Sequence, residues 1–425
     1  MNAQADIRSE TLAMQSYRDS LDAICRAAEL LPASRLPLSQ ACGHVLAEDV
    51  RAPIAVPSFE NSAMDGFAFA SADVATAAPD APVCLAVVGA SIAGDTAGLS
   101  HLEPGRAAKI MTGAPMPDGT DTVMPVEAAS WEHESLTFTA PYPRGRHVRL
   151  VGQDITADDL LLKAGTRVRA AHLPMLCASG AAQVMVHMRP KACWISTGQE
   201  ISDDFTEPLA PGHIYNATAL YGRTVCEDMG IDFADATTVR DTPQDFASAL
   251  ESALESDARI ILSTGGVSAG QYDFVKPVLE DFGAHIHVHR VRIKPAKPVL
   301  FATLPGGKYF FGLPGNPIST ALALRAFVEP FARVLSGLAP ERPLKARLTG
   351  RVYGTPGKTA FLMGQLASDE SGQLHAKADE RQQSFQTAPF GRSNAWLVIP
   401  EEVETIAAGE LVDCIPFTSC PYDGR

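Results

Sequence analysis

The spacing of apolar and polar residues changes near Lys191, and the change marks the clearest folding unit in the chain. From there to about Leu338, short apolar runs such as Ala192-Cys-Trp-Ile-Ser196 alternate with longer amphipathic stretches. Between residues 246 and 254 the apolar residues recur at helical spacing, and Thr242 suits the cap of that helix. Strands that alternate with helices of this length predict a doubly wound, mostly parallel α/β sheet.

Other segments have different patterns. Tyr17 to Leu31 has helical spacing, short extended pieces follow as far as Val56, and the mixed apolar stretch from Leu160 to Val186 is predicted to pack back on this first segment. From Val83 to Glu127 the pattern is β-like, with frequent glycine and proline. After Pro340, short β-like pieces predict a small β domain. The pattern therefore predicts a multidomain α/β plus β protein.

The stretch from Arg259 to Asp273 carries the strongest signal for a binding site. A short apolar run passes into paired glycines, hydroxyl side chains and a carboxylate, as at the carboxyl end of a parallel strand, where open α/β sheets bind their ligands. Glycines there let backbone amides approach a ligand closely, and hydroxyls can donate to its oxygens. The candidates in this stretch are Ser263, Thr264, Gly265, Gly266, Ser268 and Gly270.

Charged residues are predicted to gather at the same edge, because they follow neighbouring strands. Three carboxylates there could hold a hard cation such as Mg²⁺, and two lysines would meet phosphate oxygens. Together they predict phosphoryl or nucleotidyl chemistry on a small anionic ligand. The carboxylates are Glu200, Asp241 and Asp273, the lysines are Lys294 and Lys297, and Asn316 follows in the last loop.

Polar groups also concentrate in loops that precede the α/β unit. Phe59–Phe67 offers an amide, a hydroxyl and the carboxylate of Asp65, and binding groups are concentrated on loops. Thr112 lies in a second polar turn. Arg149 closes a basic cluster just before Asp154, where it either contacts an anion or belongs to a solvated face.

Composition narrows the class of partner. The formal net charge of −14 argues against general binding of nucleic acid or anionic membranes. The eight cysteines include no CxxC pair, the first residues lack an apolar signal core, and no later apolar run reaches membrane-spanning length. We therefore expect a soluble, cytoplasmic protein with no nucleic-acid or membrane partner.

Two patterns favour other chemistry. Gly266-Val-Ser-Ala-Gly270 fits the GxSxG nucleophile elbow of hydrolases, with Asp281 and His289 as possible partners, but the doubled glycine and the nearby lysines suit a cradled anion better. His285, His287 and His289 alternate along a predicted strand and share a face. Three histidines at that spacing do not easily converge on one ion, so we expect a packed or solvated strand face.

Assembled in order, these blocks make the chain resemble the molybdopterin molybdenumtransferases, the MoeA family that includes the gephyrin E domain. The resemblance runs from Ala41 to Asn394. Phe59–Phe67 is similar to the family's FDNSAMDGYA, and Thr112–Pro117 is similar to its TGAxxP. The further blocks follow in the family's order and are Gly152–Asp154, Ser196–Glu200, Ser263–Asp273, Lys294–Pro298 and Gly312–Pro317.

The resemblance implies that molybdate is inserted into adenylylated molybdopterin, with Mg²⁺-dependent cleavage of the adenylate and release of AMP and molybdenum cofactor. It implies a homodimer whose cleft lies between the ligand domain of one subunit and the SAMDG region of the other, and it allows molybdopterin adenylyltransferase and apo molybdoenzymes as partners. The implied domains are an extended N-terminal dimerisation domain of residues 1–55 and 154–190, a β-rich domain of residues 56–153, a molybdopterin-binding α/β domain of residues 191–338 and a C-terminal β-barrel of residues 339–425.

Carried over position by position, the family's functional residues fall on both sides of that cleft. The resemblance implies that Asp65, Glu200, Asp241 and Asp273 are catalytic and that the last three bind the metal. The expected substrate-binding residues, which include those of the glycine-containing stretch described above, are Thr112, Arg149, Asp154, Ser263, Gly265, Gly266, Ser268, Gly270, Lys294, Lys297, Pro314, Asn316 and Pro317.

The sequence also departs from the family pattern. Gln153 and Gln199 stand where an acid is usual, Glu60 where Asp is usual, Gln271 where Glu is common, and Met363 where Arg is frequent. Lost negative charge would weaken metal binding. Two alternatives therefore stay open: a diverged pterin-binding or adenylylating paralogue, and a non-catalytic scaffold of the same fold.

Overall fold

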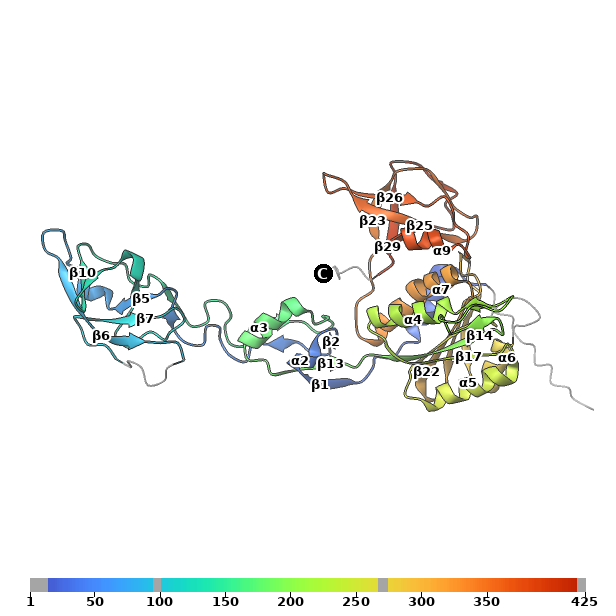
Figure 1. Cartoon of the computed structure of the whole chain (residues 1–425), viewed down its shortest axis with the longest axis horizontal. Helices are drawn as coiled ribbons and strands as arrows, with labels where there is room; N and C mark the ends of the chain where they lie inside the picture. The colour runs from blue at the N-terminus through green and yellow to red at the C-terminus, as the bar shows by residue number, and fades with distance from the viewer. Residues whose placement is uncertain (1–13, 95–100, 267–273, 419–425) are drawn as a thin grey trace, which may run out of the picture.

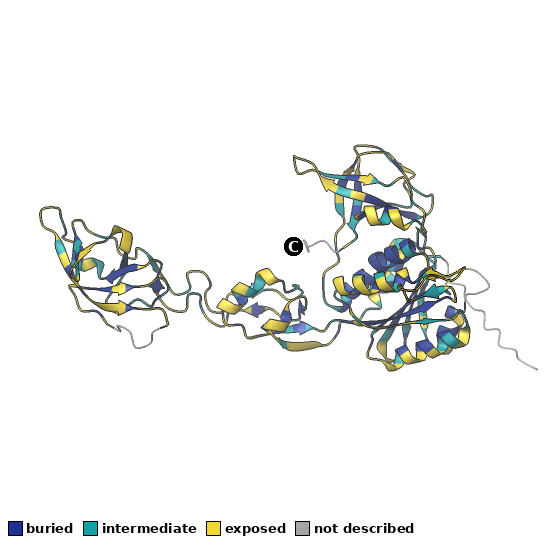
Figure 2. Cartoon of the chain, viewed as in Figure 1, coloured by how far each residue is buried: buried dark blue, intermediate teal, exposed yellow. Residues whose placement is uncertain are grey.

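The computed structural model describes residues 14–94, 101–266 and 274–418 and has an elongated shape (Figure 1). A sheet lobe, here the β lobe, lies at one end. A small middle lobe follows, and the α/β lobe lies at the other end beside a β-barrel. Buried residues gather inside each of these parts (Figure 2). A chain of 425 residues is long enough to build several hydrophobic cores.

The sheet of the α/β lobe has the strand order β17-β14-β18-β22-β21-β19. The first four strands are parallel, as predicted. Strand β21 is antiparallel to both of its neighbours, β22 and β19, so it alone runs against the other five strands. The strands are β14 (Lys191–Thr197), β17 (Asp232–Val239), β18 (Ile260–Thr264), β19 (His285–His289), β21 (Leu300–Leu304) and β22 (Lys308–Leu313). The helices are α4 (Ala217–Asp228), α5 (Pro243–Glu255), α6 (Val275–Asp281), α7 (Pro317–Ala323) and α8 (Glu329–Leu335), with a π-helical turn at Leu324–Val328.

Local sequence explains these elements. Strand β18 is buried along its whole length, which its continuous apolar character requires in a sheet covered on both faces. Helix α5 begins where Thr242 accepts a hydrogen bond from the Asp245 amide at 3.1 Å, and Pro243 occupies its first turn. The predicted apolar stripe of α5 faces the core. Its buried members are Phe246, Ala249, Leu250 and Ala253.

The β lobe has a six-stranded sheet in the order β8-β5-β7-β6-β10-β9. Phe67, Phe69 and Phe138 fill its core, so the β-like pattern predicted for this region is confirmed. The strands are β5 (Gly66–Phe69), β6 (Val83–Ser91), β7 (Arg106–Ile110), β8 (Thr122–Pro125), β9 (Ser130–Glu132) and β10 (Ser135–Phe138). A separate ladder pairs β4 (Asn61–Ser62) with β11 (Val148–Arg149).

The middle lobe pairs β1 (Ala33–Pro37) and β2 (Val45–Leu46) with β13 (Gln183–His187), so the second segment packs back on the first, as predicted. A further ladder joins β3 (Val50–Arg51) to β12 (Leu160–Leu162), and the helices are α2 (Leu38–Ala41) and α3 (Leu173–Ala178). Helix α1 (Tyr17–Arg26) instead packs on the α/β lobe, where Tyr17 meets the ring of Phe327. Tyr17 also meets the ring of Phe361, which belongs to the C-terminal domain. The domain boundaries given above stay predictions.

The C-terminal strands close into a five-stranded barrel, because β25 pairs with both β26 and β27. The predicted small barrel is therefore confirmed. Its strands are β23 (Leu344–Leu348), β25 (Thr359–Ser368), β26 (Leu374–Ala378), β27 (Ala395–Ile399) and β29 (Leu411–Pro416), with α9 (Thr387–Arg392) and a ladder of β24 (Val352–Tyr353) with β28 (Thr405–Ile406). Within the described ranges, none of the helices is both long enough and apolar enough to cross a membrane.

Candidate functional site

The glycine turn, residues 263–266, lies at the carboxyl edge of the parallel sheet. The Thr197 hydroxyl at the end of β14 donates to the Thr264 carbonyl at 3.3 Å, and the Gly198 amide donates to the Val239 carbonyl at 3.1 Å. The ends of β14, β17 and β18 are therefore adjacent. This is the edge where the sequence predicted a ligand.

Gly265 is packed against the end of β14 so closely that no side chain fits. Its φ of +90° lies in the left-handed region, and a Cβ atom there would lie 2.3 Å from Thr197 Oγ1 and 2.6 Å from the Thr197 carbonyl oxygen. Gly266 follows with a φ of +63°. Two consecutive left-handed residues turn the chain sharply, which explains why the sequence places paired glycines here.

Two buried hydroxyls border the glycine turn. Ser263 and Thr264 are 0% and 2% exposed, and neither hydroxyl forms a hydrogen bond within the part of the chain that the structure describes. An unpaired buried hydroxyl costs on the order of 1–3 kcal/mol. Hydroxyls without a partner beside a tight glycine turn are suited to a polar ligand, which would satisfy them.

The predicted carboxylates follow neighbouring strands at this edge. Glu200 is exposed just beyond β14, and its carbonyl accepts the Ile214 amide at 2.8 Å, which ties it to the short ladder of β15 (Ile201–Ser202) with β16 (Ile214–Tyr215). Asp241 is half-buried just beyond β17. In the described ranges no three His, Cys, Asp or Glu side chains are close enough to hold a metal ion. The third predicted ligand, Asp273, lies outside these ranges, as do Ser268 and Gly270.

The loop after β22 supplies the next group. Asn316 caps α7 and is exposed, and its Nδ2 donates to Ser384 Oγ of the barrel at 3.3 Å. The Pro314 carbonyl accepts from the Thr320 hydroxyl, and Pro317 occupies the first turn of α7. Gly315 lies beside the glycine turn, since a Cβ there would be 4.0 Å from the Gly265 amide nitrogen. The loop therefore belongs to the same site.

Residues 290–299 form the lysine loop, which carries Lys294 and Lys297. Both lysines are exposed. The loop ends at Leu300, which pairs with Gly312 near the carboxyl end of β22, so the register places the loop at the site edge. Ala296 lies between the lysines with a φ of +69° and is 3% exposed, so its methyl group is anchored in the core while its neighbours face solvent.

A second group of predicted residues lies in the β lobe. The Thr112 amide donates to Asp65 Oδ1 at 2.7 Å, and this amide, followed by the Thr112 hydroxyl, lowers the pKa of the Asp65 carboxyl. Arg149 lies opposite Asn61 in the β4–β11 ladder. The Asn61 side chain is buried, and its Oδ1 is unpaired among the described residues. Asp65, Thr112 and Arg149 therefore form one exposed surface.

Asp154 lies apart from this surface, in the connector toward the middle lobe. Its amide donates to the Val56 carbonyl at 3.0 Å, and its side chain borders a hollow of about 700 Å³ beside α3. Within one chain the middle lobe separates the β lobe from the α/β lobe (Figure 1). The structure therefore brings the predicted residues together as two groups, and a single chain does not join them.

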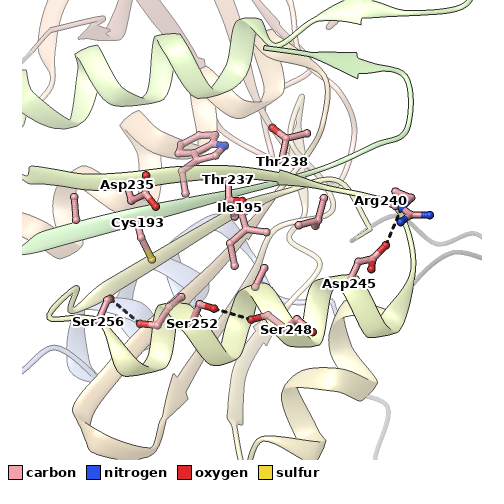
Figure 3. A pocket seen from close by; sticks show the side chains of 15 residues that line it. Cys193, Ile195, Asp235, Thr237, Thr238, Arg240, Asp245, Ser248, Ser252 and Ser256 are labelled. Carbon is pink, nitrogen blue, oxygen red and sulfur yellow. Dashed lines mark hydrogen bonds and ion pairs between the residues drawn. The ribbon is translucent and has the colours of Figure 1, made fainter. Parts of the chain in front are cut away.

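A cavity of about 620 Å³ lies next to the site, between β17 and α5 (Figure 3). Ser248 and Ser252 line it from α5, and Ser256 lines it from the end of that helix. The hydroxyls of Ser252 and Ser256 donate to carbonyls of α5. At its mouth Arg240 pairs with Asp245 at 3.3 Å. The cavity contains none of the predicted site residues, and its hydroxyls are largely satisfied.

Sequence reasoning missed Ser384, which reaches the site loop from the barrel. Its partner Asn316 is 68 positions away, so no local pattern could join the two residues. The three histidines behave as expected of a packed strand face: the rings of His285 and His287 are 4.6 Å apart between centroids, and His287 Nε2 bonds Thr303 Oγ1 at 3.0 Å.

Three family models match consecutive parts of the chain. Residues 15–180 match the model described as MoeA N-terminal region (domain I and II). Residues 193–334 match a probable molybdopterin binding domain, and residues 345–417 match the MoeA C-terminal region (domain IV).

Relatives match this chain over nearly its whole length. The molybdopterin molybdenumtransferase of Synechococcus elongatus is 32% identical over 94% of this chain and 98% of its own length. The molybdopterin molybdenumtransferase of Haemophilus influenzae is 32% identical over 90% of this chain and 93% of its own length. The crystal structure of the molybdopterin biosynthesis MoeA protein of Pyrococcus horikoshii superposes with a TM-score of 0.80 at 28% identity and covers 96% of this chain and 100% of that one.

Proposed function

The chain belongs to the MoeA family of molybdopterin molybdenumtransferases, and we propose that it inserts molybdate into adenylylated molybdopterin with release of AMP and molybdenum cofactor. The curated relatives carry the name of a transferase, and the chain is a transferase of molybdenum cofactor biosynthesis. We also propose that the protein is cytoplasmic and that molybdopterin adenylyltransferase and apo molybdoenzymes are its partners.

One observation carries the proposal: an anion cradle at the carboxyl edge of the α/β sheet. The glycine turn offers close backbone approach and two buried hydroxyls that are unpaired among the described residues, and the lysine loop brings two exposed ammonium groups to the same edge. Backbone amides and lysines suit phosphate and molybdate oxygens. In this proposal the turn holds the pyrophosphate of the substrate, and Lys294 and Lys297 hold its phosphate or the incoming molybdate.

The donor set beside the cradle fits Mg²⁺. Glu200 and Asp241 follow adjacent parallel strands and supply carboxylate oxygens, which this hard cation prefers. Together with Asp273 they would hold the ion, which would polarise a phosphoryl oxygen when bound. The residues of the chain itself bind and orient the substrate. The Thr112 amide and hydroxyl hold the Asp65 carboxylate and lower its pKa.

We propose that two chains complete each site. Asp65, Thr112 and Arg149 lie in the β lobe, and the middle lobe separates them from the anion cradle of the same chain (Figure 1). Apolar side chains are exposed on both sides of the proposed contact: Met64, Met111 and Leu150 in the β lobe, and Phe205 and Leu220 in the α/β lobe. Exposed apolar residues next to functional groups indicate an interaction surface. A homodimer would place the β lobe of one chain on the cradle of the other.

The glutamines that replace family acids are compatible with this function. Gln153 Oε1 accepts the Leu150 amide at 3.0 Å, a bond that a carboxylate would also make. The substitution therefore preserves the loop that carries Arg149. The carboxylates at Asp154 and Glu200 remain in place. The alternative of a diverged, pterin-binding paralogue rests on the lost charge at Gln153 and Gln199.

The direct test supplies adenylylated molybdopterin, molybdate and Mg²⁺ and measures AMP release together with reconstitution of an apo molybdoenzyme. We expect both products. Tight ligand binding without AMP release would favour the diverged paralogue.

Subunit complementation tests the shared site. Asp65→Asn and Lys297→Gln should each abolish turnover, and an equimolar mixture of the two variants should regain about a quarter of the wild-type rate, because half of randomly paired dimers contain one intact site of two. A mixture that stays inactive after subunit exchange would contradict the inter-subunit site.

A further inference from the structure

The lysine loop contacts both the α/β lobe and the barrel. Its first half contains β20 (Ile293–Lys294), which pairs in parallel with Thr359 and Ala360 at the start of β25. The Thr359 amide also donates to the Arg292 carbonyl at 3.0 Å. A strand of the α/β lobe therefore extends the sheet of the barrel, and the barrel helps to set the position of Lys294.

Apolar anchors fix the rest of the loop. Val291, Ile293, Ala296 and Val299 are at most 3% exposed and join the main core of the α/β lobe. The Val291 amide donates to the Lys297 carbonyl at 2.9 Å. The polar members of the loop alternate with these anchors. The anchors therefore keep the loop folded, and the two-residue strand β20 is its weakest attachment, since short strands have few ladder bonds.

Arg292 reinforces that attachment. Its Nε and one terminal nitrogen donate to the two carboxylate oxygens of Glu401, each at 3.3 Å, and Glu401 lies just beyond β27 of the barrel. The other terminal nitrogen donates to the Met14 carbonyl at 3.5 Å, and the Arg292 amide donates to the Gln15 carbonyl at 2.8 Å. A forked pair of this kind fixes direction as well as distance, which a single lysine contact would not do.

We propose that Arg292 is a positioning residue: its forked ion pair with Glu401 clamps the lysine loop to the barrel and so holds Lys294 and Lys297 in place at the site. The role rests on the proposed function of the lysines, and Arg292 itself acts through them without touching substrate. The side chains of Arg292 and Glu401 are 38% and 31% exposed, so solvent screens the pair and its removal should loosen the loop without unfolding the lobe.

The test uses the full-length chain and four variants. Arg292→Met and Glu401→Met each break the clamp, and Arg292→Glu combined with Glu401→Arg reverses it. Lys345→Met is the matched control, because it breaks the Lys345–Asp413 ion pair on the same barrel at a distance from the loop in the sheet order. The readouts are hydrogen exchange of the amides of residues 290–299, and kcat and KM for molybdate in AMP release.

We expect both single variants to speed exchange in the lysine loop by roughly two- to fivefold, as loss of a partly exposed ion pair allows. The KM for molybdate should rise by a similar factor while kcat changes by less than about twofold, because misplaced lysines weaken binding more than chemistry. The reversed pair should restore both values toward wild type, and Lys345→Met should leave both unchanged.

Loop exchange and KM that match the control in both single variants would overturn the positioning role. So would an equal rise of loop exchange and KM in the Lys345→Met control, since that would indicate a general effect on the barrel. A wild-type chain that releases no AMP would refute the proposed function instead. The exchange measurement needs no turnover and would still decide whether the clamp fixes the loop.

Discussion

Replacing Gly265 by alanine tests how tightly the glycine turn is built. The new Cβ would lie 2.3 Å from Thr197 Oγ1 and 2.6 Å from the Thr197 carbonyl oxygen. The hydroxyl could rotate away. The carbonyl cannot, because Thr197 ends β14 in the interior of the sheet, where the strand pairs on both sides. The turn itself would have to move.

Two costs add up in this variant. An alanine in the left-handed region costs roughly 1–2 kcal/mol, and forcing extra volume into a packed site costs typically about 1–3 kcal/mol. We therefore expect Gly265→Ala to lower local stability by about 2–5 kcal/mol. Gly306→Ala is the matched control. Gly306 has a φ of +74° in the turn between β21 and β22 and would place its Cβ with nothing within 4 Å, so only the first cost applies.

The assay is hydrogen exchange of the β14 and β18 amides in the native protein, because a chain with several lobes need not unfold in one step and exchange reports each region separately. Adding Thr197→Ala to Gly265→Ala should recover only part of the loss, since the carbonyl oxygen at 2.6 Å remains. If Gly265→Ala proved as mild as Gly306→Ala, the close packing of the turn would be refuted. Substrate affinity should fall in parallel with β18 protection.

Two further predictions concern charged groups. Because the Thr112 amide and hydroxyl lower the pKa of Asp65, this carboxylate contributes stability that is present above the unfolded pKa and is lost as the pH falls through the lowered folded pKa. An NMR titration should place the pKa of Asp65 below that of an unperturbed aspartate, and Thr112→Pro, which removes the amide and the hydroxyl, should raise it. Arg325 is 4% exposed and forms ion pairs with Glu329 at 3.1 Å and with Glu341 at 2.6 Å. Arg325→Met removes the arginine partner of both carboxylates and should destabilise the junction of α8 and the barrel by roughly 3–5 kcal/mol, measured by hydrogen exchange. Glu341→Gln keeps the Arg325–Glu329 pair and should cost clearly less.

The sequence pattern predicted the parallel half of the α/β sheet well, because buried parallel strands are continuous apolar runs and the caps of α5 are local signals. The antiparallel edge was not anticipated in detail. Strands β21 and β22 flank Pro305-Gly-Gly307, a turn sequence that returns the chain directly beside itself. That turn was the available signal, and it explains why β21 runs against the other five strands of the sheet.

Some features of the site could be predicted from the local sequence, and others depend on contacts between residues far apart in the chain. Paired glycines indicate a turn with left-handed backbone, so the turn at Gly265 and Gly266 could be predicted from the sequence. The hydrogen bond from Thr112 to Asp65 and the pairing of Ile293 with Thr359 join residues far apart in the chain. No local periodicity contains such pairings. They follow from packing of whole lobes, which only the structure supplies.

The acidity of the chain explains why the site has to be rigid. With a net charge of −14, the long-range field repels an anionic substrate, and this repulsion fades only beyond a Debye length of about 8 Å at physiological salt. Binding must therefore come from short contacts, and each side chain that is immobilised on binding costs about 0.5–1.5 kcal/mol. Groups fixed in advance avoid that cost. Gly265 against Thr197, buried Ala296 between two lysines, and the Thr112 amide on Asp65 each fix a group in the folded chain itself. Because the net negative charge repels the substrate everywhere else, we expect the substrate to bind only where all of these preorganised contacts are present.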